Sequence, residues 1–235
     1  MTETIILTGA IRPAWPVLRN DPMTRLTDYL CAIRRWLDVP TLQQVIYCDA
    51  SGCVIPEEVF ASEKFESLSF DISELAKQHG PSMAEMLNIS FILKNSRFPI
   101  NDFFKCTGRI FVNNFAKMSR EMEWKQDVSL FLRPWYADGW ADTRFFRIRT
   151  ECFKQWIEPR IPELTGYHQG GQVVESLFHE YLSKANLFSE PRMVGYGGHC
   201  NNPYEEDYSD REKQYADEVI QEFGFQTFLC HATSQ

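Results

Sequence analysis

Short apolar runs that end in turn residues alternate with segments of helical spacing along the first half of the chain. The runs at 4–10, 44–49 and 67–72 are typical of buried strands, because each is brief, apolar and closed by Gly, Asp or Ser. Residues 26–37 and 75–94 carry apolar side chains at helical spacing. This alternation predicts an α/β fold in which neighbouring strands are parallel.

The second half continues the pattern. We expect strands at 104–112, 129–135, 142–148 and 226–229, helices at 172–185 and 210–223, and a polar loop at 194–210. The helical segment 75–94 is interrupted near Gly80, and Ser82 with Glu85 predicts a capping box where the helix restarts. Because no repeat or linker is visible, the sequence predicts one three-layer α/β domain of Rossmann-like topology over residues 1–235, with a mainly parallel central sheet.

The composition excludes several classes of protein. A net charge of −8 argues against a general nucleic-acid binder, which normally carries a basic face. The seven cysteines form no CxxC pair, so neither a disulfide framework nor a structural zinc site is supported, and reduced cysteines in a cytosolic protein fit best. No apolar run approaches the ~20 residues of a membrane span. Walker A, GxGxxG and HExxH motifs do not occur.

Polar residues stand at the ends of several predicted strands. They are Thr8, Gly9 and Arg12 after the first strand, Asp49 after the second, and Asp142 and Arg144 at the mouth of the strand 142–148. Ligands of open α/β sheets bind outside the carboxyl ends of the strands, so these residues are candidates for lining a pocket. Two alternatives stay open: each is a turn residue, or Asp142 and Arg144 form a local structural pair.

The segment 103–112 is the most unusual strand of the sequence. It gathers Lys105, Thr107, Gly108 and Arg109 within an otherwise apolar run. Lys and Arg are almost never buried unless paired, and two cations beside a hydroxyl suit a diphosphate or a polyhydroxyl ligand. On a continuous strand Lys105, Thr107 and Arg109 would share one face.

Two segments resemble the donor-site segments of GT-A-type bacterial glycosyltransferases of surface-polysaccharide (O-antigen or capsule) biosynthesis. They are Lys105–Arg109, which has the pattern KxTGR, and Asp142–Phe146, which has the sequence DTRFF. The resemblance is sharpest over 103–112 and 141–147, and Cys106 departs from it where an apolar residue is expected. It implies a GT-A-like domain, with a donor-binding part at about 1–150 and an acceptor or closing part at about 151–235. It also implies transfer of a hexosyl group from a nucleotide-sugar donor, with a UDP-sugar favoured, to a glycan or lipid-linked glycan. Such an enzyme is expected in the cytoplasm, or peripherally at the inner face of the cytoplasmic membrane.

The resemblance gives the candidate residues roles. Asp49 would accept hydrogen bonds from the ribose or the base. The other donor-binding candidates are Thr8, Gly9, Arg12, Lys105, Thr107, Gly108, Arg109, Asp142 and Arg144. Asp-x-Asp, which holds a divalent cation in many GT-A enzymes, is absent. Asp142 with His199 is therefore the candidate ligand pair for Mn²⁺ or Mg²⁺, and metal-independent action is an equal alternative.

Glu175 is the leading candidate for a catalytic base. It follows Gly170 and Gly171 in the first turn of a predicted helix, where the helix dipole favours its ionised form. His179, one turn later, is expected to assist. The alternative is that Glu175 only stabilises the start of the helix. Two other functions remain open, a sugar-nucleotide nucleotidyltransferase and a non-catalytic carbohydrate- or nucleotide-binding module.

Overall fold

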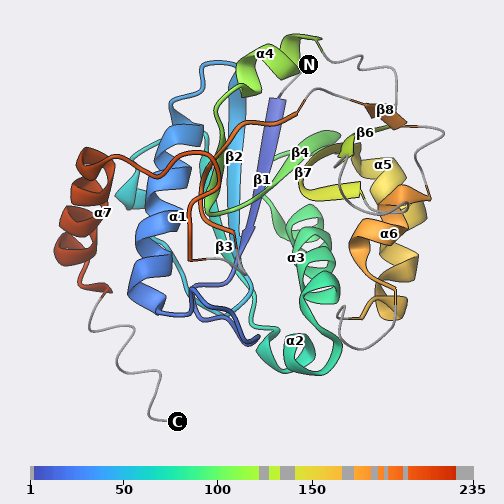
Figure 1. Ribbon diagram of the computed structural model, residues 1–235, viewed down its shortest axis with the longest axis horizontal. Coiled ribbons are helices and arrows are strands. Elements are labelled where there is room, and N and C mark those ends of the chain that lie inside the picture. The colour runs from blue at the N-terminus through green and yellow to red at the C-terminus, as the bar shows by residue number, and fades with distance from the viewer. Residues whose placement is uncertain are drawn as a thin grey trace.

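The computed structural model describes residues 3–121, 127–132, 141–165, 172–180, 185–187, 190–197 and 201–225 of the chain. Within these residues a central sheet has seven strands in the order β3-β2-β1-β4-β7-β6-β8 (Figure 1). The strands are β1 (Glu3–Gly9), β2 (Leu42–Asp49), β3 (Phe65–Ser69), β4 (Asp102–Thr107), β6 (Val128–Leu132), β7 (Ala141–Arg149) and β8 (Ala185–Leu187). The pairs β3–β2, β2–β1, β1–β4 and β6–β8 are parallel, and β7 runs antiparallel between β4 and β6. The predicted α/β fold with a mainly parallel sheet is confirmed.

Helices cover both faces of this sheet. Alternation along β1 explains why: Ile5 and Leu7 belong to one buried cluster and Ile6 to another. Helices α1 (Pro22–Leu37) and α7 (Asp210–Glu222) cover the first cluster, and α3 (Pro81–Asn95) and α6 (Val174–His179) cover the second (Figure 1). The result is the expected order of three layers, helix, sheet and helix.

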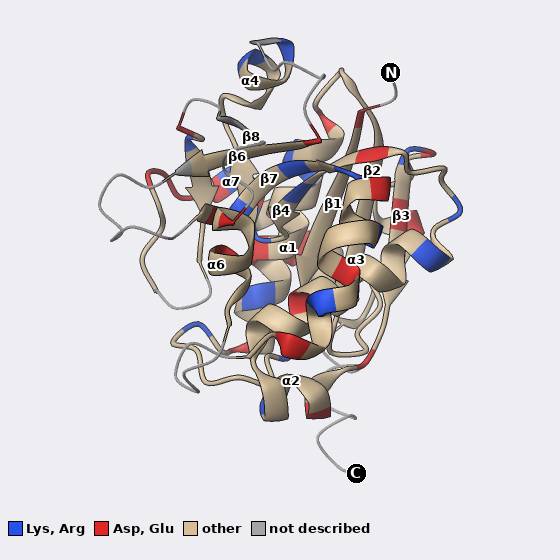
Figure 2. Cartoon of the chain, turned by 90° about the vertical axis from the view of Figure 1, so that its right-hand side faces the viewer, with Lys and Arg blue, Asp and Glu red and all other residues tan. Residues whose placement is uncertain are grey.

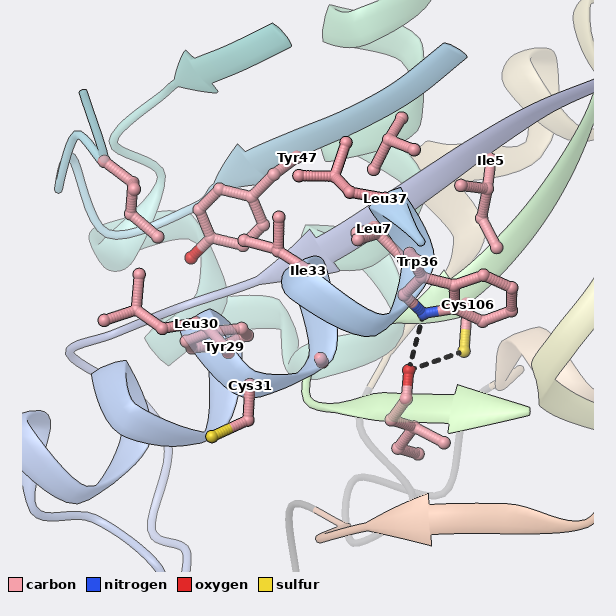
Figure 3. Close-up of a cluster of buried hydrophobic side chains, with 14 of the residues drawn as sticks. Ile5, Leu7, Tyr29, Leu30, Cys31, Ile33, Trp36, Leu37, Tyr47 and Cys106 are labelled. Atoms are coloured by element: carbon pink, nitrogen blue, oxygen red, sulfur yellow. Dashed lines mark hydrogen bonds between the residues drawn. The ribbon is translucent and has the colours of Figure 1, made fainter. Parts of the chain in front are cut away.

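Helix α1 is anchored at both ends. Asp21 caps its start by accepting a hydrogen bond from the Thr24 backbone N–H at 2.7 Å. Near its end, the Trp36 Nε1–H donates to the Ile110 carbonyl at 2.9 Å, and the Cys106 Sγ lies 3.5 Å from the same oxygen (Figure 3). Cys106 therefore packs as a small core residue, and burial raises the pKa of its thiol to about 12.

The predicted strand 104–112 is wrong in one respect that matters for the site. The chain leaves the main sheet after Thr107, and β5 (Ile110–Val112) pairs with β9 (Met193–Gly195) in a separate two-stranded sheet. Gly108 and Arg109 form the turn between β4 and β5. Arg109 consequently does not share a strand face with Lys105, contrary to the expectation from alternation.

Other predicted boundaries also move. The helix expected at 172–185 is limited to α6, because β8 begins at Ala185, and the expected loop 194–210 begins inside β9. The strand predicted at 67–72 is β3, at 65–69. The strand predicted at 226–229 and residues 133–135 lie outside the described residues. The remaining elements are η1 (Glu57–Val59), α2 (Ser73–His79), α4 (Phe115–Glu121), α5 (Thr150–Cys152), a π-helical turn (Phe153–Ile157) and a 3₁₀ segment (Glu158–Glu163).

The capping box predicted at Ser82 and Glu85 is also wrong. Gly80 is the N-cap of α3, Pro81 is at the first helical position, and no side chain of the described residues caps this helix. The Ser82 Oγ instead accepts a hydrogen bond from the Val174 backbone N–H at 3.4 Å. This leaves the Glu85 carboxylate available for contacts away from the helix start.

Acidic and basic positions are interspersed on the side of the molecule that carries α2 and α3 (Figure 2). Among the helices of the described residues, none has both the length and the apolar character needed to cross a bilayer.

Candidate functional site

A cavity of about 490 Å³ opens at the carboxyl ends of β1 and β4, beside the first residues of β7. Helices α3 and α6 and the loop after β1 supply its other walls. Its volume lies within the range of small-molecule sites, and its place is where an α/β sheet binds ligands. Nine predicted site residues line it: Thr8, Gly9, Arg12, Lys105, Thr107, Arg109, Asp142, Arg144 and Glu175.

Asp49 does not line the cavity, and its predicted contact with a ribose or base is corrected. Its carboxylate is fully buried and accepts hydrogen bonds from Ile11 N–H, Tyr47 O–H, Ser51 N–H and O–H, and Cys53 N–H, at 2.6–3.1 Å. Burial raises the pKa of Asp49, and the hydrogen bonds oppose that effect. Asp49 therefore ties the loop after β1 to the turn after β2, and it shapes the cavity without facing it.

Gly108 is not among the residues that line the cavity, and its contact with the donor stays a prediction. Its N–H donates to the Thr8 carbonyl at 2.8 Å, which joins the ends of β4 and β1. The Tyr29 ring lies against Gly9 and Gly108, and a Cβ atom would come within 2.6 Å of that ring at Gly9 and 3.1 Å at Gly108. The Tyr29 hydroxyl also accepts a hydrogen bond from the Ala10 N–H at 2.8 Å. Both glycines are needed because α1 approaches the two strand ends so closely.

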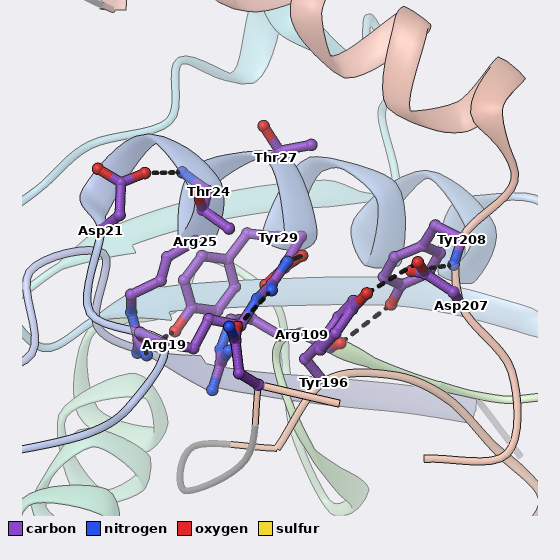
Figure 4. Close-up of polar contacts among 12 residues, drawn as sticks. Arg19, Asp21, Thr24, Arg25, Thr27, Tyr29, Arg109, Tyr196, Asp207 and Tyr208 are labelled. Atoms are coloured by element: carbon purple, nitrogen blue, oxygen red, sulfur yellow. Dashed lines mark hydrogen bonds and ion pairs between the residues drawn. The ribbon is translucent and has the colours of Figure 1, made fainter. Parts of the chain in front are cut away.

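Arg109 is the most unusual side chain of the cavity. It is 1% exposed, and within the described residues its Nε and Nη1 groups have no hydrogen-bond partner. The Asp28 carboxylate lies 3.5 Å from Nη1, close enough for an ion pair but without a hydrogen bond. Asp28 is already bound by Arg19 through two contacts of 2.6 and 2.8 Å. The guanidinium thus keeps unused donors at the cavity wall (Figure 4).

The backbone of Arg109 is held by the C-terminal segment. The Tyr208 hydroxyl donates to the Arg109 carbonyl at 3.0 Å, and the Tyr196 N–H donates to the same oxygen at 3.4 Å (Figure 4). Arg19 stacks over the Tyr196 ring at 3.6 Å from its centre. Residues far apart in sequence therefore fix the position from which the Arg109 side chain reaches the cavity.

Asp142 and Arg144 form the local pair that the sequence left open. The Arg144 Nε lies 2.9 and 3.1 Å from the two carboxylate oxygens of Asp142, and Nη2 lies 2.5 Å from one of them. The Arg144 guanidinium also lies over the Tyr204 ring, 4.5 Å from its centre. Both residues line the cavity, but the carboxylate of Asp142 is directed to Arg144.

The metal prediction is not settled by this arrangement. The described residues contain no group of three or more His, Cys, Asp or Glu side chains that could hold a metal ion. His199, the second candidate ligand, lies outside the described residues. Mn²⁺ or Mg²⁺ bound by Asp142 and His199 stays a prediction.

A polar chain forms another wall of the cavity. The Lys105 side chain is 1% exposed, and its Nζ lies 2.5 Å from Glu85 Oε1 and donates to the Thr143 carbonyl at 2.7 Å. Thr8 donates its hydroxyl to the same Glu85 oxygen at 3.1 Å. Thr143 donates its hydroxyl to Glu175 Oε1, also at 3.1 Å. Glu85 was missed as a site residue because the sequence gave it a capping role.

Glu175 lies in the first turn of α6, as expected, and faces the cavity. Burial raises the pKa of its carboxyl, and the nearby charge of Glu85 adds to this effect. A carboxylate of raised pKa in a cavity is suited to taking a proton from a hydroxyl. His179 is at the last position of α6 and is not among the lining residues, and its catalytic role stays a prediction.

Helices α1 and α3 and the loop after β1 add cavity residues that sequence reasoning overlooked. Arg25 is buried and donates to the carbonyls of Ala10 and Arg19 at 2.8 and 3.0 Å, which fixes the loop over the cavity. Trp15 lines the cavity as a flat apolar wall. Asn88 donates to the Cys48 carbonyl at 3.1 Å, while its Oδ1 is buried without a partner among the described residues. Arg25 and Asn88 lie on helices, and the spacing of polar residues in these segments did not indicate that either side chain lies at the cavity.

Comparisons with known proteins concern the fold. No family model matches the chain, and no curated protein matches its sequence. The glycosyltransferase GlyE of Streptococcus pneumoniae matches with a TM-score of 0.53 at 7% identity over 97% of this chain. The match covers 64% of the GlyE chain, so this chain spans less than two thirds of the length of GlyE. A glycosyltransferase involved in glycosylation of the major capsid of PBCV-1 matches with a TM-score of 0.50 at 10% identity, over 94% of this chain and 100% of the other. The inositol-1-phosphate CTP transferase of T. maritima matches with a TM-score of 0.47 at 12% identity, over 94% of this chain and 96% of the other.

Proposed function

We propose that this chain is a glycosyltransferase that binds a nucleoside diphosphate sugar in the cavity and transfers the sugar to a hydroxyl group. The observation that carries the proposal is the Arg109 guanidinium, which is buried at the cavity wall with two unused N–H donors. A buried donor without a partner is unfavourable, and phosphate oxygens form strong charge-assisted hydrogen bonds with guanidinium groups. The diphosphate of a nucleotide sugar would satisfy this side chain.

The rest of the cavity supports the same ligand. Trp15 offers a flat apolar surface for a base or a sugar ring, and the unpartnered Oδ1 of Asn88 offers an acceptor for an O–H or N–H group. The folds of GlyE and of the PBCV-1 enzyme are compatible with this function. A UDP-sugar as donor and a surface glycan as acceptor are finer predictions, which come from the resemblance of Lys105–Arg109 and Asp142–Phe146.

In the proposed reaction, the Glu175 carboxylate removes the proton of the acceptor hydroxyl. The acceptor oxygen then bonds to the anomeric carbon, the bond from that carbon to the diphosphate breaks, and the leaving diphosphate keeps the electron pair. Arg109 stabilises the negative charge that develops on the leaving group. Since the acceptor attacks opposite the departing diphosphate, the anomeric configuration is inverted.

The proposal is tested by incubating the protein with a panel of nucleotide sugars and simple glycoside acceptors, with and without Mn²⁺, and measuring the released nucleoside diphosphate. Glu175→Gln keeps the size of the side chain but removes its basicity. We expect turnover to fall by roughly 10²–10⁴-fold while donor affinity stays nearly unchanged. Glu180→Gln, at an exposed position just beyond α6, is the matched control and should keep full turnover.

Other outcomes identify the alternatives. Release of pyrophosphate from a nucleoside triphosphate and a sugar phosphate would indicate a nucleotidyltransferase. Saturable binding with no turnover across the panel would indicate a binding module. Full activity of Glu175→Gln, or a product of retained configuration, would refute the role of Glu175 as the base.

A further inference from the structure

Lys105 is a buried cation that the proposed reaction does not use. It lies in the middle of β4, and its ammonium group is held by Glu85 of α3 and by the backbone of Thr143 in β7. A buried ammonium needs such partners, because losing its hydration is costly. With one ion pair and one hydrogen bond made inside the protein, Lys105 is poorly placed to act as a mobile phosphate contact.

Thr143 connects this lysine to the proposed base. Its carbonyl receives the Lys105 ammonium, and its hydroxyl donates to Glu175. The contacts from Thr8 through Glu85, Lys105 and Thr143 to Glu175 therefore form one chain across β1, α3, β4, β7 and α6. This series of contacts contains two carboxylates, Glu85 and Glu175, and the ammonium group of Lys105 lies between them.

We propose that Glu85 and Lys105 are positioning residues, which hold Glu175 in place through Thr143. Glu85 disfavours the ionised form of Glu175, and Lys105 favours it. The inference rests on the proposed function, because there Glu175 is the base of the reaction. It assigns Lys105 to the base, in place of the donor contact expected from its sequence motif.

Charged side chains from several elements line the cavity together with Glu175. They are Glu85 on α3, Lys105 on β4, Arg12, Arg25 and Arg109 beside the loop after β1, and Asp142 with Arg144 on β7, where the last two neutralise each other. Glu85 disfavours a second negative charge nearby, whereas Lys105 favours it. Burial raises the pKa of Glu175 most, the charge of Glu85 raises it further, and the charge of Lys105 lowers it.

The test is a pH titration of the Glu175 carboxyl carbon by NMR on protein labelled with ¹³C at glutamate Cδ, with Glu175→Gln used to assign the signal. In Lys105→Met the titration midpoint should rise, and in Glu85→Gln it should fall, as expected for the loss of a neighbouring charge. Lys94→Met is the control and should leave the midpoint unchanged. Lys94 lies near the far end of α3, the helix that carries Glu85, and pairs with Glu158 at 2.8 Å.

Lys105→Met leaves Glu85 without its cation, so the double variant Glu85→Gln/Lys105→Met provides the comparison if the single variant does not fold. Relative to Glu85→Gln alone, the double variant should show a higher midpoint. Midpoints that stay fixed, or that move in the same direction in both single variants, would overturn the proposal. Because the titration needs no substrate, its result is independent of turnover. If the midpoints shift as expected but Glu175→Gln keeps full activity, the proposed function is refuted and the positioning role of Glu85 and Lys105 is not.

Discussion

Replacing Arg109 with Met should separate ligand binding from stability. In the protein without ligand, the change removes two buried nitrogen donors, Nε and Nη1, that have no hydrogen-bond partner among the described residues, and each such donor costs about 1–3 kcal/mol. It also removes the attraction between Arg109 and Asp28, whose nearest atoms are 3.5 Å apart. Asp28 itself stays bound by Arg19 through two contacts. The two effects oppose each other, so we expect the free energy of unfolding to change by less than about 2 kcal/mol, or roughly 4–8 °C in Tm.

The effect on binding should be much larger. Hydrogen bonds to charged groups contribute about 1.5–3 kcal/mol each, so the loss of two such bonds to a diphosphate amounts to about 3–6 kcal/mol. This corresponds to a Kd weakened by roughly 10²–10⁴-fold. Arg109→Lys keeps the charge but not the forked geometry, and should lie between the wild type and Arg109→Met.

The measurement is a thermal-shift titration with UDP, GDP, CDP and ADP, followed by calorimetry with the nucleotide that stabilises the wild type most. Arg149→Gln, at an exposed arginine at the opposite end of β7, is the control and should bind like the wild type. An unchanged Kd in Arg109→Met would refute the role of Arg109 in holding the ligand. A fall in Tm well beyond the expected range would show that its role is structural.

Two further predictions concern stability. Burial alone would raise the pKa of Glu212, but hydrogen bonds from Arg35 and Ser209 outweigh it and lower the pKa to about 2. The stabilisation from this lowered pKa is present above the ordinary pKa of about 4.3 and is lost as the pH falls toward 2. The Tm of the wild type should therefore drop more steeply than the Tm of Glu212→Gln over this pH range. Parallel Tm curves would contradict the prediction. Trp36→Phe keeps a ring in the core but loses the hydrogen bond to Ile110, and chemical denaturation should report a loss of about 1–3 kcal/mol; an unchanged denaturation midpoint would show that the hydrogen bond contributes nothing.

The sequence predicted the elements near the start of the chain well, because there the local signals agree. The apolar runs of β1 and β2 end at Gly9 and Asp49, as expected. The helix expected at 26–37 is α1, but it begins four residues earlier, at Pro22, where Asp21 caps it. It failed at β4 and β5, where the largely apolar run 104–112 contains a turn at Gly108 and Arg109. That turn depends on pairing of β5 with β9, more than eighty residues later, which no local pattern contains.

The site was predictable as a region but less so in its chemistry. Most candidates line one cavity because the carboxyl ends of parallel strands must meet at one edge. Asp49 was misjudged because a carboxylate at a strand end can face inward to hold a turn as readily as outward to a ligand. Glu85 and Arg25 lie on helices, where their role depends on which face meets the sheet, and the spacing of polar residues does not determine this.

The way β5 and Tyr208 hold Arg109 has a consequence for the order of assembly during synthesis. The first 190 residues contain every described strand of the main sheet, yet the contacts that hold the Arg109 backbone come from β9, Tyr196 and Tyr208. A nascent chain can therefore form most of its core before the Arg109 side chain is in position. If Arg109 holds the ligand as proposed, nucleotide binding should appear only after Tyr208 has emerged from the ribosome, and a bound nucleotide would report that β5 and β9 have paired.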